Sequence, residues 1–209
     1  MPQSSIEEML RQEYLDLLPE IQSVASALEA EIREQLHGIL AGLRSHEQIL
    51  IKSRIKKCDS AVKTLRGKSD GRVFDPDRAG EYSIKKLPDL VGVRILVFPD
   101  NRVEQVDQEL KSHFGGWRDD PVLDSFGLEL AHKYDGYLNK ISLNVKAEYQ
   151  VVPMLLGLFW EVEHSAMYKS EIVANSKNMQ KRRAIVETAL SDLRQESQVS
   201  CLTLPDQRE

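Results

Sequence analysis

The pattern of apolar and polar residues predicts long helices on either side of a sheet. From residue 5 to residue 43, apolar side chains recur every three or four positions, as on one face of a helix. Pro19 lies within this stretch. Because proline is tolerated in the first turn of a helix but poorly later, we expect a second helix to begin there. Similar spacing from Ile49 to Leu65 predicts a further helix that ends near Gly67.

The stretch from Leu90 to Phe98 is almost wholly apolar and β-branched. Such a run predicts a strand buried on both faces, which ends at Pro99. Arg94 lies inside this strand. Because burial of an unpaired guanidinium is costly, we expect Arg94 to emerge at a cleft and to meet a carboxylate or a phosphate.

Shorter segments complete the predicted order of elements. The pattern predicts a helix at 103–114, short strands at 127–134, 137–143 and 148–152, a strongly apolar segment at 153–168 and a polar helix at about 176–195. Helices, a sheet and then helices indicate an α+β (mixed α/β) fold. The segment 69–83 is rich in Gly, Asp and Pro, which predicts a mobile loop, and its length favours a lid or a binding loop.

Composition limits the size and class of the protein. With 209 residues, 41% of them hydrophobic, the chain can form one domain with helical extensions. We expect an N-terminal helical extension (1–48), a central domain (49–170) and a C-terminal helix with a disordered tail (171–209). The apolar helices at both ends favour a homo-oligomer. No apolar stretch reaches the roughly 20 residues that span a bilayer, and no secretory signal is visible, so we expect a cytoplasmic protein without a membrane partner.

The cysteine and histidine content argues against two kinds of site. Two cysteines are too few for a disulfide framework, and neither they nor the five histidines have the spacing of metal ligands. A zinc site built by the protein alone is therefore not expected.

Positive charge is concentrated in one segment of an acidic chain. The stretch from Lys52 to Arg72 has eight Lys or Arg and two Asp, whereas the whole chain has a net charge of −5. A broad duplex nucleic-acid surface usually needs basic charge over a whole face, so a compact polyphosphate such as a nucleotide fits better. On the expected helix, Arg54, Lys57 and Ser60 would share one face. A solvated basic helix face is the alternative.

The usual phosphate-binding loops are missing, so side chains would have to hold a nucleotide. Neither GxxxxGK[ST] nor GxGxxG occurs in the sequence. Asp89 precedes the buried strand, and Glu148 opens another strand. Two carboxylates that converge at adjacent strand ends can bind Mg²⁺, or one can act as a base while the other binds the metal. Each carboxylate alone is more often a surface acid.

Five segments, taken in order, resemble the synthetase domain of the RelA/SpoT family in its short, stand-alone form. They are RIKKCDS at 54–60, DLVGVRI at 89–95, GY at 136–137, EYQV at 148–151 and FWEVEHSAMYK at 159–169. The resemblance implies a nucleotidyltransferase-like fold with a central mixed sheet of about five strands. It also implies transfer of pyrophosphate from ATP to the ribose 3′-hydroxyl of GDP or GTP, which forms (p)ppGpp.

The resemblance also implies a role for each matched residue. The ATP side would consist of Arg54, Lys56, Ser60, Lys63 and Arg94. Asp89 would hold Mg²⁺, and Glu148 would complete the metal site or help to deprotonate the attacking hydroxyl. On the acceptor side, Lys133 would meet phosphates and Tyr137 would stack on the base. Phe159 and Trp160 are interpreted as core residues, and Glu163 and His164 as structural.

The sequence departs from the family pattern mainly on the acceptor side. Ile141 replaces the usual histidine, and Val152 and Pro153 replace Arg-Thr. Thr64 stands where the family usually has a lysine, although the residue before it is Lys63. A second register would match Gly127 and His132 to the family's glycine and histidine, but it places Leu128 where the tyrosine belongs.

Two alternatives therefore remain open. The acceptor could be an adenine nucleotide or the 3′ end of tRNA, for which the last helix offers basic residues: Lys177, Lys181, Arg182 and Arg183. The chain could instead be a catalytically silent nucleotide-binding module.

Overall fold

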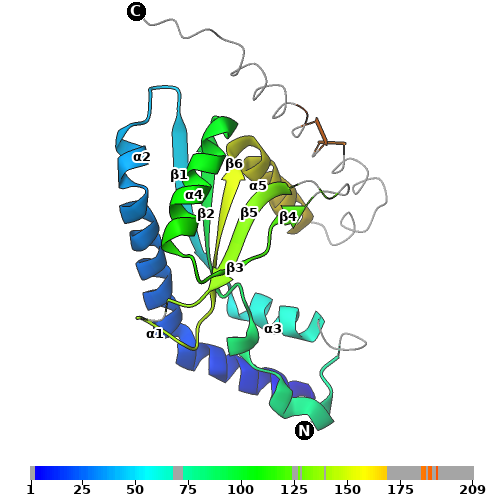
Figure 1. Cartoon of the computed structure of the whole chain (residues 1–209). Coiled ribbons are helices and arrows are strands. Elements are labelled where there is room, and N and C mark those ends of the chain that lie inside the picture. The colour runs from blue at the N-terminus through cyan, green and yellow to red at the C-terminus, as the bar shows by residue number, and fades with distance from the viewer. Residues whose placement is uncertain are drawn as a thin grey trace, which may run out of the picture.

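The computed structural model describes residues 3–67, 73–123, 127, 129–138, 140–168, 185–186, 188–189 and 192. These residues form a mixed α/β fold around a six-stranded sheet, in which the strand order is β1-β2-β6-β5-β3 and β4 pairs with β5 (Figure 1). The predicted fold class is confirmed. Within the described residues, no helix is long and apolar enough to cross a membrane. The predicted division at residues 48 and 170, the homo-oligomer and the cytoplasmic location stay predictions.

The sheet combines parallel and antiparallel pairs. Its strands are β1 (Gln48–Ile55), β2 (Val91–Phe98), β3 (Arg118–Asp119), β4 (Val122–Leu123), β5 (Glu129–Gly136) and β6 (Ala147–Pro153). The central pair, β2 and β6, is parallel, and the remaining pairs are antiparallel. The strand predicted from Leu90 to Phe98 is thus at the centre of the sheet, which explains its apolar sequence.

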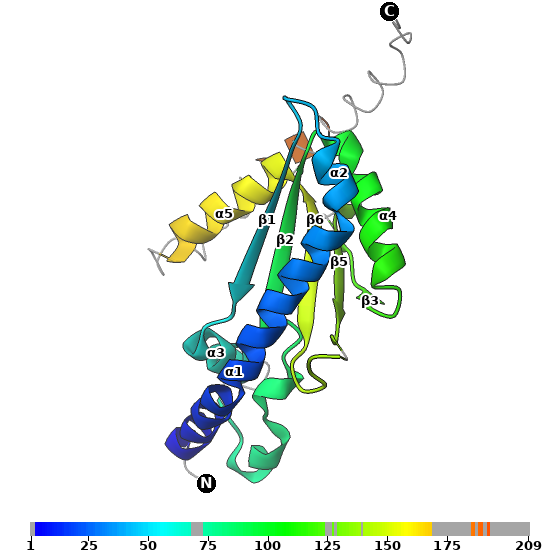
Figure 2. The ribbon, with the colours of Figure 1, turned by 90° about the vertical axis from the view of Figure 1, so that its left-hand side faces the viewer.

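Helices cover the two faces of the sheet unequally (Figures 1 and 2). The α-helices are α1 (Gln3–Gln35), α2 (His37–Ala41), α3 (Cys58–Gly67), α4 (Val103–His113) and α5 (Met154–Tyr168). Short 3₁₀ helices span Pro76–Glu81, Ile84–Lys86 and Asp100–Arg102. α1 and α4 pack on one face and bury the main core against it, whereas α5 covers only part of the other face.

The helix predicted from Ile49 to Leu65 is wrong in its first half. Gln48–Ile55 is a strand, and all eight of its residues pair with Phe98–Val91 of β2. The spacing of Ile49, Ile51 and Ile55 fits alternation along a strand as well as a helix. Because β2 offers a complete edge for pairing, tertiary contacts decide in favour of the strand. The predicted end near Gly67 is confirmed as the end of α3.

The strand predicted at 137–143 is also wrong, because this segment turns back toward β6. The backbone N–H groups of Ile141 and Ser142 both donate to the carbonyl of Leu138. The Ser142 hydroxyl then accepts from the N–H groups of Asn144 and Val145, at 3.0 and 2.9 Å. Serine often stabilises turns in this way.

Pro19 does not begin a separate helix, since it lies inside the 33 residues of α1. α1 bends part of the way along its length (Figure 1), and proline is the residue most often found at such bends. The helix predicted at 103–114 is confirmed as α4, and the apolar segment at 153–168 forms α5. The predicted helix at 176–195, the loop residues 68–72 and the tail lie wholly or largely outside the described residues.

Candidate functional site

The face of the sheet that α5 leaves open has two rows of mostly polar residues. Alternate residues of a strand face the same side, so the strand register defines these rows. The first row consists of Arg54, Gly92, Glu148, Asp135 and Arg118, one from each of β1, β2, β6, β5 and β3. The second consists of Lys52, Arg94, Gln150 and Lys133. We call these nine residues the polar rows.

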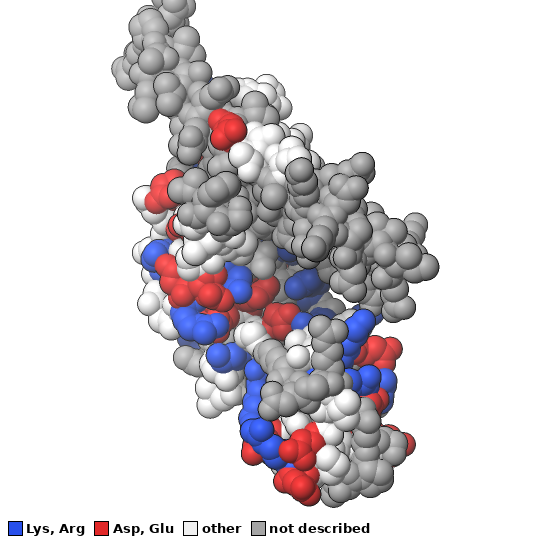
Figure 3. All heavy atoms as spheres, turned by 90° about the vertical axis from the view of Figure 1, so that its right-hand side faces the viewer, with Lys and Arg blue, Asp and Glu red and all other residues white. Residues whose placement is uncertain are grey.

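The second polar row lies at the border of the area that α5 covers, since Lys52 and Arg94 contact α5 at Glu161 and Trp160. Val152 lies two residues after Gln150 on β6 and packs with Leu96, Ala131 and Leu156 beneath α5. The departure from the family pattern at Val152 is therefore part of an apolar contact with α5. Seen from the right of Figure 1, acidic and basic side chains lie side by side, and this view shows no continuous basic surface (Figure 3).

Glu148 is a largely buried carboxylate that lies near Arg54 on the polar rows. Its side chain is 9% exposed. One carboxylate oxygen, Oε1, accepts a hydrogen bond of 2.9 Å from Nε2 of Gln150 and lies 4.0 Å from Nη2 of Arg54. Burial raises the pKa of Glu148 above its usual range, and the nearby Asp89 adds to this effect, while Lys133 and Arg54 oppose it. A carboxylate with a raised pKa is a better proton acceptor than an ordinary surface carboxylate.

Gly92 provides the space in which Arg54 and Glu148 approach each other. A Cβ atom at this position would lie 3.3 Å from Nε of Arg54 and 3.8 Å from Cγ of Glu148. The glycine therefore lets two long side chains from β1 and β6 lie over β2. Sequence reasoning included Gly92 in a matched segment but gave it no role.

Asp89 forms an ion pair with Lys56 where β1 and β2 meet the rest of the chain. Nζ of Lys56 lies 2.5 Å from Oδ2 of Asp89, and the two side chains are 15% and 21% exposed. The backbone N–H of Lys56 donates to the carbonyl of Leu90 at 2.9 Å, which fixes the position of this lysine. The structure thus places Lys56 and Asp89 together, with Asp89 close enough to Glu148 to influence its pKa.

The donor set around Asp89 and Glu148 fits Mg²⁺ only together with a substrate. Within the described residues, no group of three or more His, Cys, Asp or Glu side chains could hold a metal ion. Protein-bound Mg²⁺ is commonly held by one or two carboxylates plus substrate phosphates and water. Two carboxylates with basic residues beside them agree with that arrangement.

Arg54, Lys57 and Ser60 do not share a helix face, contrary to the prediction. Arg54 lies on β1, Lys57 precedes α3, and Ser60 lies in the first turn of α3. Lys63 is exposed on α3, and Thr64 donates its hydroxyl to the carbonyl of Ser60. Within the described contacts, neither Ser60 nor Lys63 bonds to Arg54, Asp89 or Glu148 through its side chain.

Arg94 contacts an amide and an indole ring within the protein, and the expected contact with a carboxylate or a phosphate stays a prediction. Its Nε donates to Oε1 of Gln150 at 3.1 Å, and its guanidinium carbon lies 5.7 Å from the ring centroid of Trp160. Burial lowers the pKa of Arg94, and the nearby Arg54 adds to this effect. Trp160 and Phe159 are half-buried, and the side chains of Glu163 and His164 lie outside the described ones.

The two predicted acceptor residues lie in different surroundings. Lys133 belongs to the polar rows and forms an ion pair of 2.7 Å with Asp120. Tyr137 follows β5 and lines a cavity of about 760 Å³, beside Lys146, whose Nζ lies 5.6 Å from the tyrosine ring centroid. α1 and the segments that follow α4 and β5 also contribute to the cavity wall.

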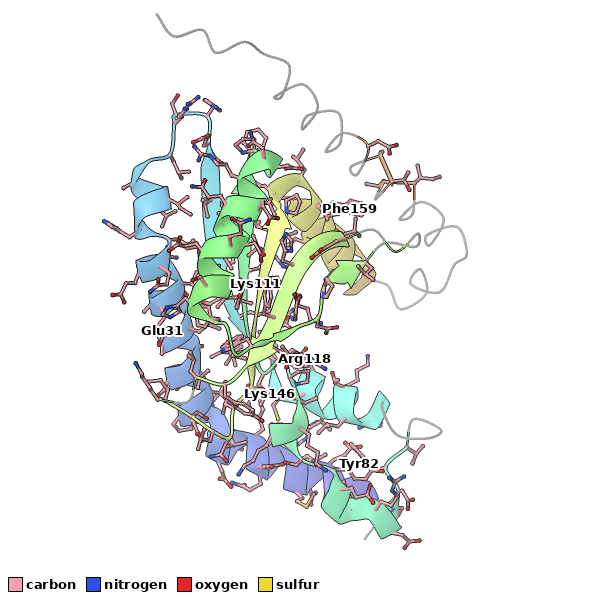
Figure 4. All side chains as sticks on the ribbon, viewed as in Figure 1. Glu31, Tyr82, Lys111, Arg118, Lys146 and Phe159 are labelled. Carbon is pink, nitrogen blue, oxygen red and sulfur yellow. The ribbon has the colours of Figure 1, made fainter. Side chains whose placement is uncertain are left out.

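Asp135, which sequence reasoning missed, connects the polar rows to this cavity. It pairs with Glu148 in the strand register and also lines the cavity. Its side chain is 1% exposed and contacts Arg118 at 2.5 Å and Lys146 at 3.3 Å. These two basic residues are labelled in Figure 4. The predicted strand at 127–134 ended one residue too early to place Asp135 beside Glu148.

His132, which the second register matches to the family's histidine, does not face the other candidate residues. His132 lies on the opposite face of β5 from Lys133, where its Nδ1 is 2.7 Å from Glu129 and 3.8 Å from Asp107 of α4. It therefore does not face the polar rows.

Ile141, which replaces the family's histidine near the acceptor, is 45% exposed. The basic residues Lys177, Lys181, Arg182 and Arg183 lie outside the described residues.

Solved structures of small alarmone synthetases have a similar fold. Small alarmone synthetase 1 from Bacillus subtilis bound to its product pppGpp is 18% identical, with 93% of this chain and 99% of that chain covered and a TM-score of 0.66. Small alarmone synthetase 2 from the same organism is 19% identical, with 90% of this chain and 98% of that chain covered and a TM-score of 0.63.

A GTP pyrophosphokinase family protein from Streptococcus pneumoniae is 20% identical, with 87% of this chain and 88% of that chain covered and a TM-score of 0.56. The sequence matches no protein-family profile and no curated protein. These structures confirm the resemblance to the short, stand-alone synthetases at the level of the fold.

Proposed function

We propose that this protein is an ATP-dependent pyrophosphotransferase that moves the β,γ-pyrophosphate of ATP to the ribose 3′-hydroxyl of GDP or GTP and so makes (p)ppGpp. One observation carries the proposal. Arg54, Lys56, Asp89, Arg94 and Glu148 come from three separate parts of the sequence and lie at or beside one open face of the sheet. The surrounding fold is that of small alarmone synthetases, one of them bound to pppGpp.

On this proposal, the basic side chains bind the donor. Arg54 and Arg94 lie close enough for each to affect the other electrostatically, and a polyphosphate between them would relieve their repulsion. Lys56 would exchange part of its contact with Asp89 for a phosphate oxygen. Mg²⁺ would be held by Asp89, Glu148 and substrate phosphates, where it would neutralise developing negative charge.

The carboxylate of Glu148 is the candidate group to take the proton from the attacking hydroxyl. A bond forms between the acceptor's 3′-oxygen and the β-phosphorus of ATP. The bond from that phosphorus to the oxygen that bridges the α- and β-phosphates breaks, and AMP leaves with that oxygen. The raised pKa of Glu148 makes its carboxylate a stronger base, and completion of the metal site is its alternative role.

The acceptor is proposed to reach from the cavity at Tyr137 toward Glu148. Asp135 borders both places, and a cavity of about 760 Å³ is large enough for one nucleotide. Tyr137 offers an aromatic ring for stacking, and Lys133 and Lys146 offer positive charge. These features support a mononucleotide acceptor.

A transfer assay tests the proposal. The protein and Mg²⁺ are incubated with ATP labelled at its terminal phosphates, with GDP, GTP, ADP, ATP or bulk tRNA offered separately, and the labelled products are resolved. We expect transfer to GDP or GTP. Transfer to tRNA alone, or to an adenine nucleotide alone, would replace the acceptor in the proposal. ATP binding without transfer to any acceptor would show a catalytically silent nucleotide-binding module.

A further inference from the structure

Gln150 occupies the middle of the second polar row, between Arg94 of β2 and Lys133 of β5. Its Oε1 accepts from Nε of Arg94 at 3.1 Å, and its Nε2 donates to Oε1 of Glu148 at 2.9 Å. The chemistry of the partners fixes this orientation of the amide, because a guanidinium only donates and an ionised carboxylate only accepts. One side chain thus bonds to both an arginine and a carboxylate.

Arg94 is also restrained from a second direction. Its guanidinium lies over the ring of Trp160 on α5, with 5.7 Å between the guanidinium carbon and the ring centroid. α5 is tied to the sheet by an ion pair between Lys52 and Glu161, with 2.8 Å between Nζ and Oε2. Trp160 therefore limits movement of the guanidinium out of its plane, and Gln150 limits its rotation about Nε.

We propose that Gln150 is a positioning residue that couples the donor-binding Arg94 to Glu148, the candidate base for the acceptor hydroxyl. The inference rests on the proposed function. Residues 148 and 150 lie two apart on one strand, so their side chains share a face, and the amide spans the distance between them. Loss of the amide would release Arg94 and Glu148 together, whereas loss of its N–H₂ group alone would release only Glu148.

Two substitutions of similar size separate these effects. Gln150→Met removes both hydrogen bonds, and Gln150→Glu keeps an acceptor for Arg94 but cannot donate to Glu148 when ionised. Gln105→Met is the matched control. The side-chain oxygen of Gln105 accepts from Nη1 of Arg102 at 2.7 Å. Gln105 lies in α4 and Arg102 in the 3₁₀ helix before it, so both are away from the polar rows. The midpoint of thermal unfolding identifies any variant that has lost its fold.

Donor affinity and turnover are then measured separately. Calorimetry with a non-hydrolysable ATP analogue and Mg²⁺ gives the donor Kd, and the transfer assay gives kcat and both KM values. For Gln150→Met we expect donor binding to weaken and kcat to fall, each roughly 10- to 100-fold, as for the loss of a hydrogen bond to a charged group. Gln150→Glu should keep the donor Kd within about threefold and still lose kcat by a similar factor. Gln105→Met should match the wild type.

A readout without nucleotide tests the contact itself. The Nε–H proton of Arg94, assigned by its disappearance in Arg94→Lys, should exchange with solvent slowly in the wild type and in Gln150→Glu, and fast in Gln150→Met. Fast exchange in the wild type would overturn the inference. So would a Gln150→Met variant with unchanged donor Kd and kcat, or equal loss of donor affinity in both Gln150 variants.

The two proposals can fail separately. A wild-type chain that transfers to no acceptor would refute the proposed function, while the exchange rate at Arg94 and the analogue Kd would still decide the role of Gln150. An active wild type with an indifferent Gln150→Met would refute only the role of Gln150.

Discussion

Gly136 is the last residue of β5, and its lack of a side chain allows Trp117 to lie against the strand. A Cβ atom at this position would lie 2.5, 2.6 and 2.7 Å from three atoms of the Trp117 ring, far inside ordinary van der Waals contact. The ring cannot move away freely. It packs against Phe114 and Tyr149, with centroid distances of 5.0 and 5.5 Å. Gly136→Ala should therefore displace the indole and disturb the aromatic cluster.

The expected cost follows from the overlap. Overpacking by a single methyl group in a well-packed site costs about 1–3 kcal/mol. In a protein of this size each kcal/mol lowers Tm by roughly 2–4 °C, so Gly136→Ala should lower Tm by roughly 2–12 °C in a circular dichroism melt. Trp117 and Tyr137 both line the cavity. The KM for the acceptor should therefore rise, while the KM for ATP should stay within about twofold because the donor residues lie elsewhere.

A control variant and a double-mutant cycle test whether overlap with the Trp117 ring causes the loss of stability in Gly136→Ala. Gly116 adjoins Trp117 and also lines the cavity, but a Cβ there would meet nothing within 4 Å. Gly116→Ala should leave Tm and both KM values unchanged. In a double-mutant cycle, Trp117→Leu should remove most of the cost of Gly136→Ala, with a coupling of about 1 kcal/mol or more. An additive cycle, or a Gly136→Ala variant as stable as the wild type, would refute the reasoning.

Three further predictions concern the polar rows and the buried hydroxyl of Tyr149. Asp89→Asn and Glu148→Gln should each reduce transfer at least about 100-fold without loss of fold, as measured by the transfer assay and by melting; retained activity in both would mean that other carboxylates act. Because burial raises the pKa of Glu148, its carboxyl group keeps a proton to higher pH in the folded chain than in the unfolded chain. The free energy of unfolding therefore falls as pH rises from the pKa of Glu148 in the unfolded chain to its pKa in the folded chain. Glu148→Gln removes that loss, so its Tm should exceed that of the wild type at pH 8, with a smaller difference near pH 4; a lower Tm at pH 8 would contradict this. The hydroxyl of Tyr149 is buried without a hydrogen-bond partner among the described residues, so Tyr149→Phe should lower Tm by no more than about 2 °C in a calorimetric scan, and a larger loss would reveal an unseen partner.

The sequence predicts an element well where its spacing of apolar residues fits only a helix or only a strand. The run from Leu90 to Phe98 is too apolar and β-branched for anything but a buried strand, and the stripe of α4 has helical spacing only. Residues 49–55 fit both periods, so their structure depends on pairing with β2. In the strand register, Gln48 pairs with Phe98 and Ile55 pairs with Val91. This partner strand lies far along the sequence, and local spacing does not reveal it.

The candidate site could be predicted in part for the same reason. The basic residues Arg54 and Lys56 stand out because they are neighbours in a charged segment. Asp89 and Glu148 come together through the parallel pairing of β2 with β6. Their positions at the starts of two predicted strands suggested that they could converge, but local spacing did not show that these two strands are neighbours. Asp135 carried no signal at all, because its position beside Glu148 depends on where β5 ends.

The basic segment acts through separate elements, and this changes what its charge means. Arg54 on β1 lies near Glu148, and Lys56, just after β1, is paired with Asp89. Lys133 is likewise paired with Asp120. Each of these cations already has an acidic neighbour, so the positive charge of these three residues is partly offset in the folded chain. A polyphosphate can bind there only if the cations exchange carboxylate for phosphate oxygens, and the released carboxylates then need a cation of their own. On the proposed function, this exchange predicts that nucleotide binding at this face depends on Mg²⁺, and it reconciles a proposed polyphosphate site with a net charge of −5.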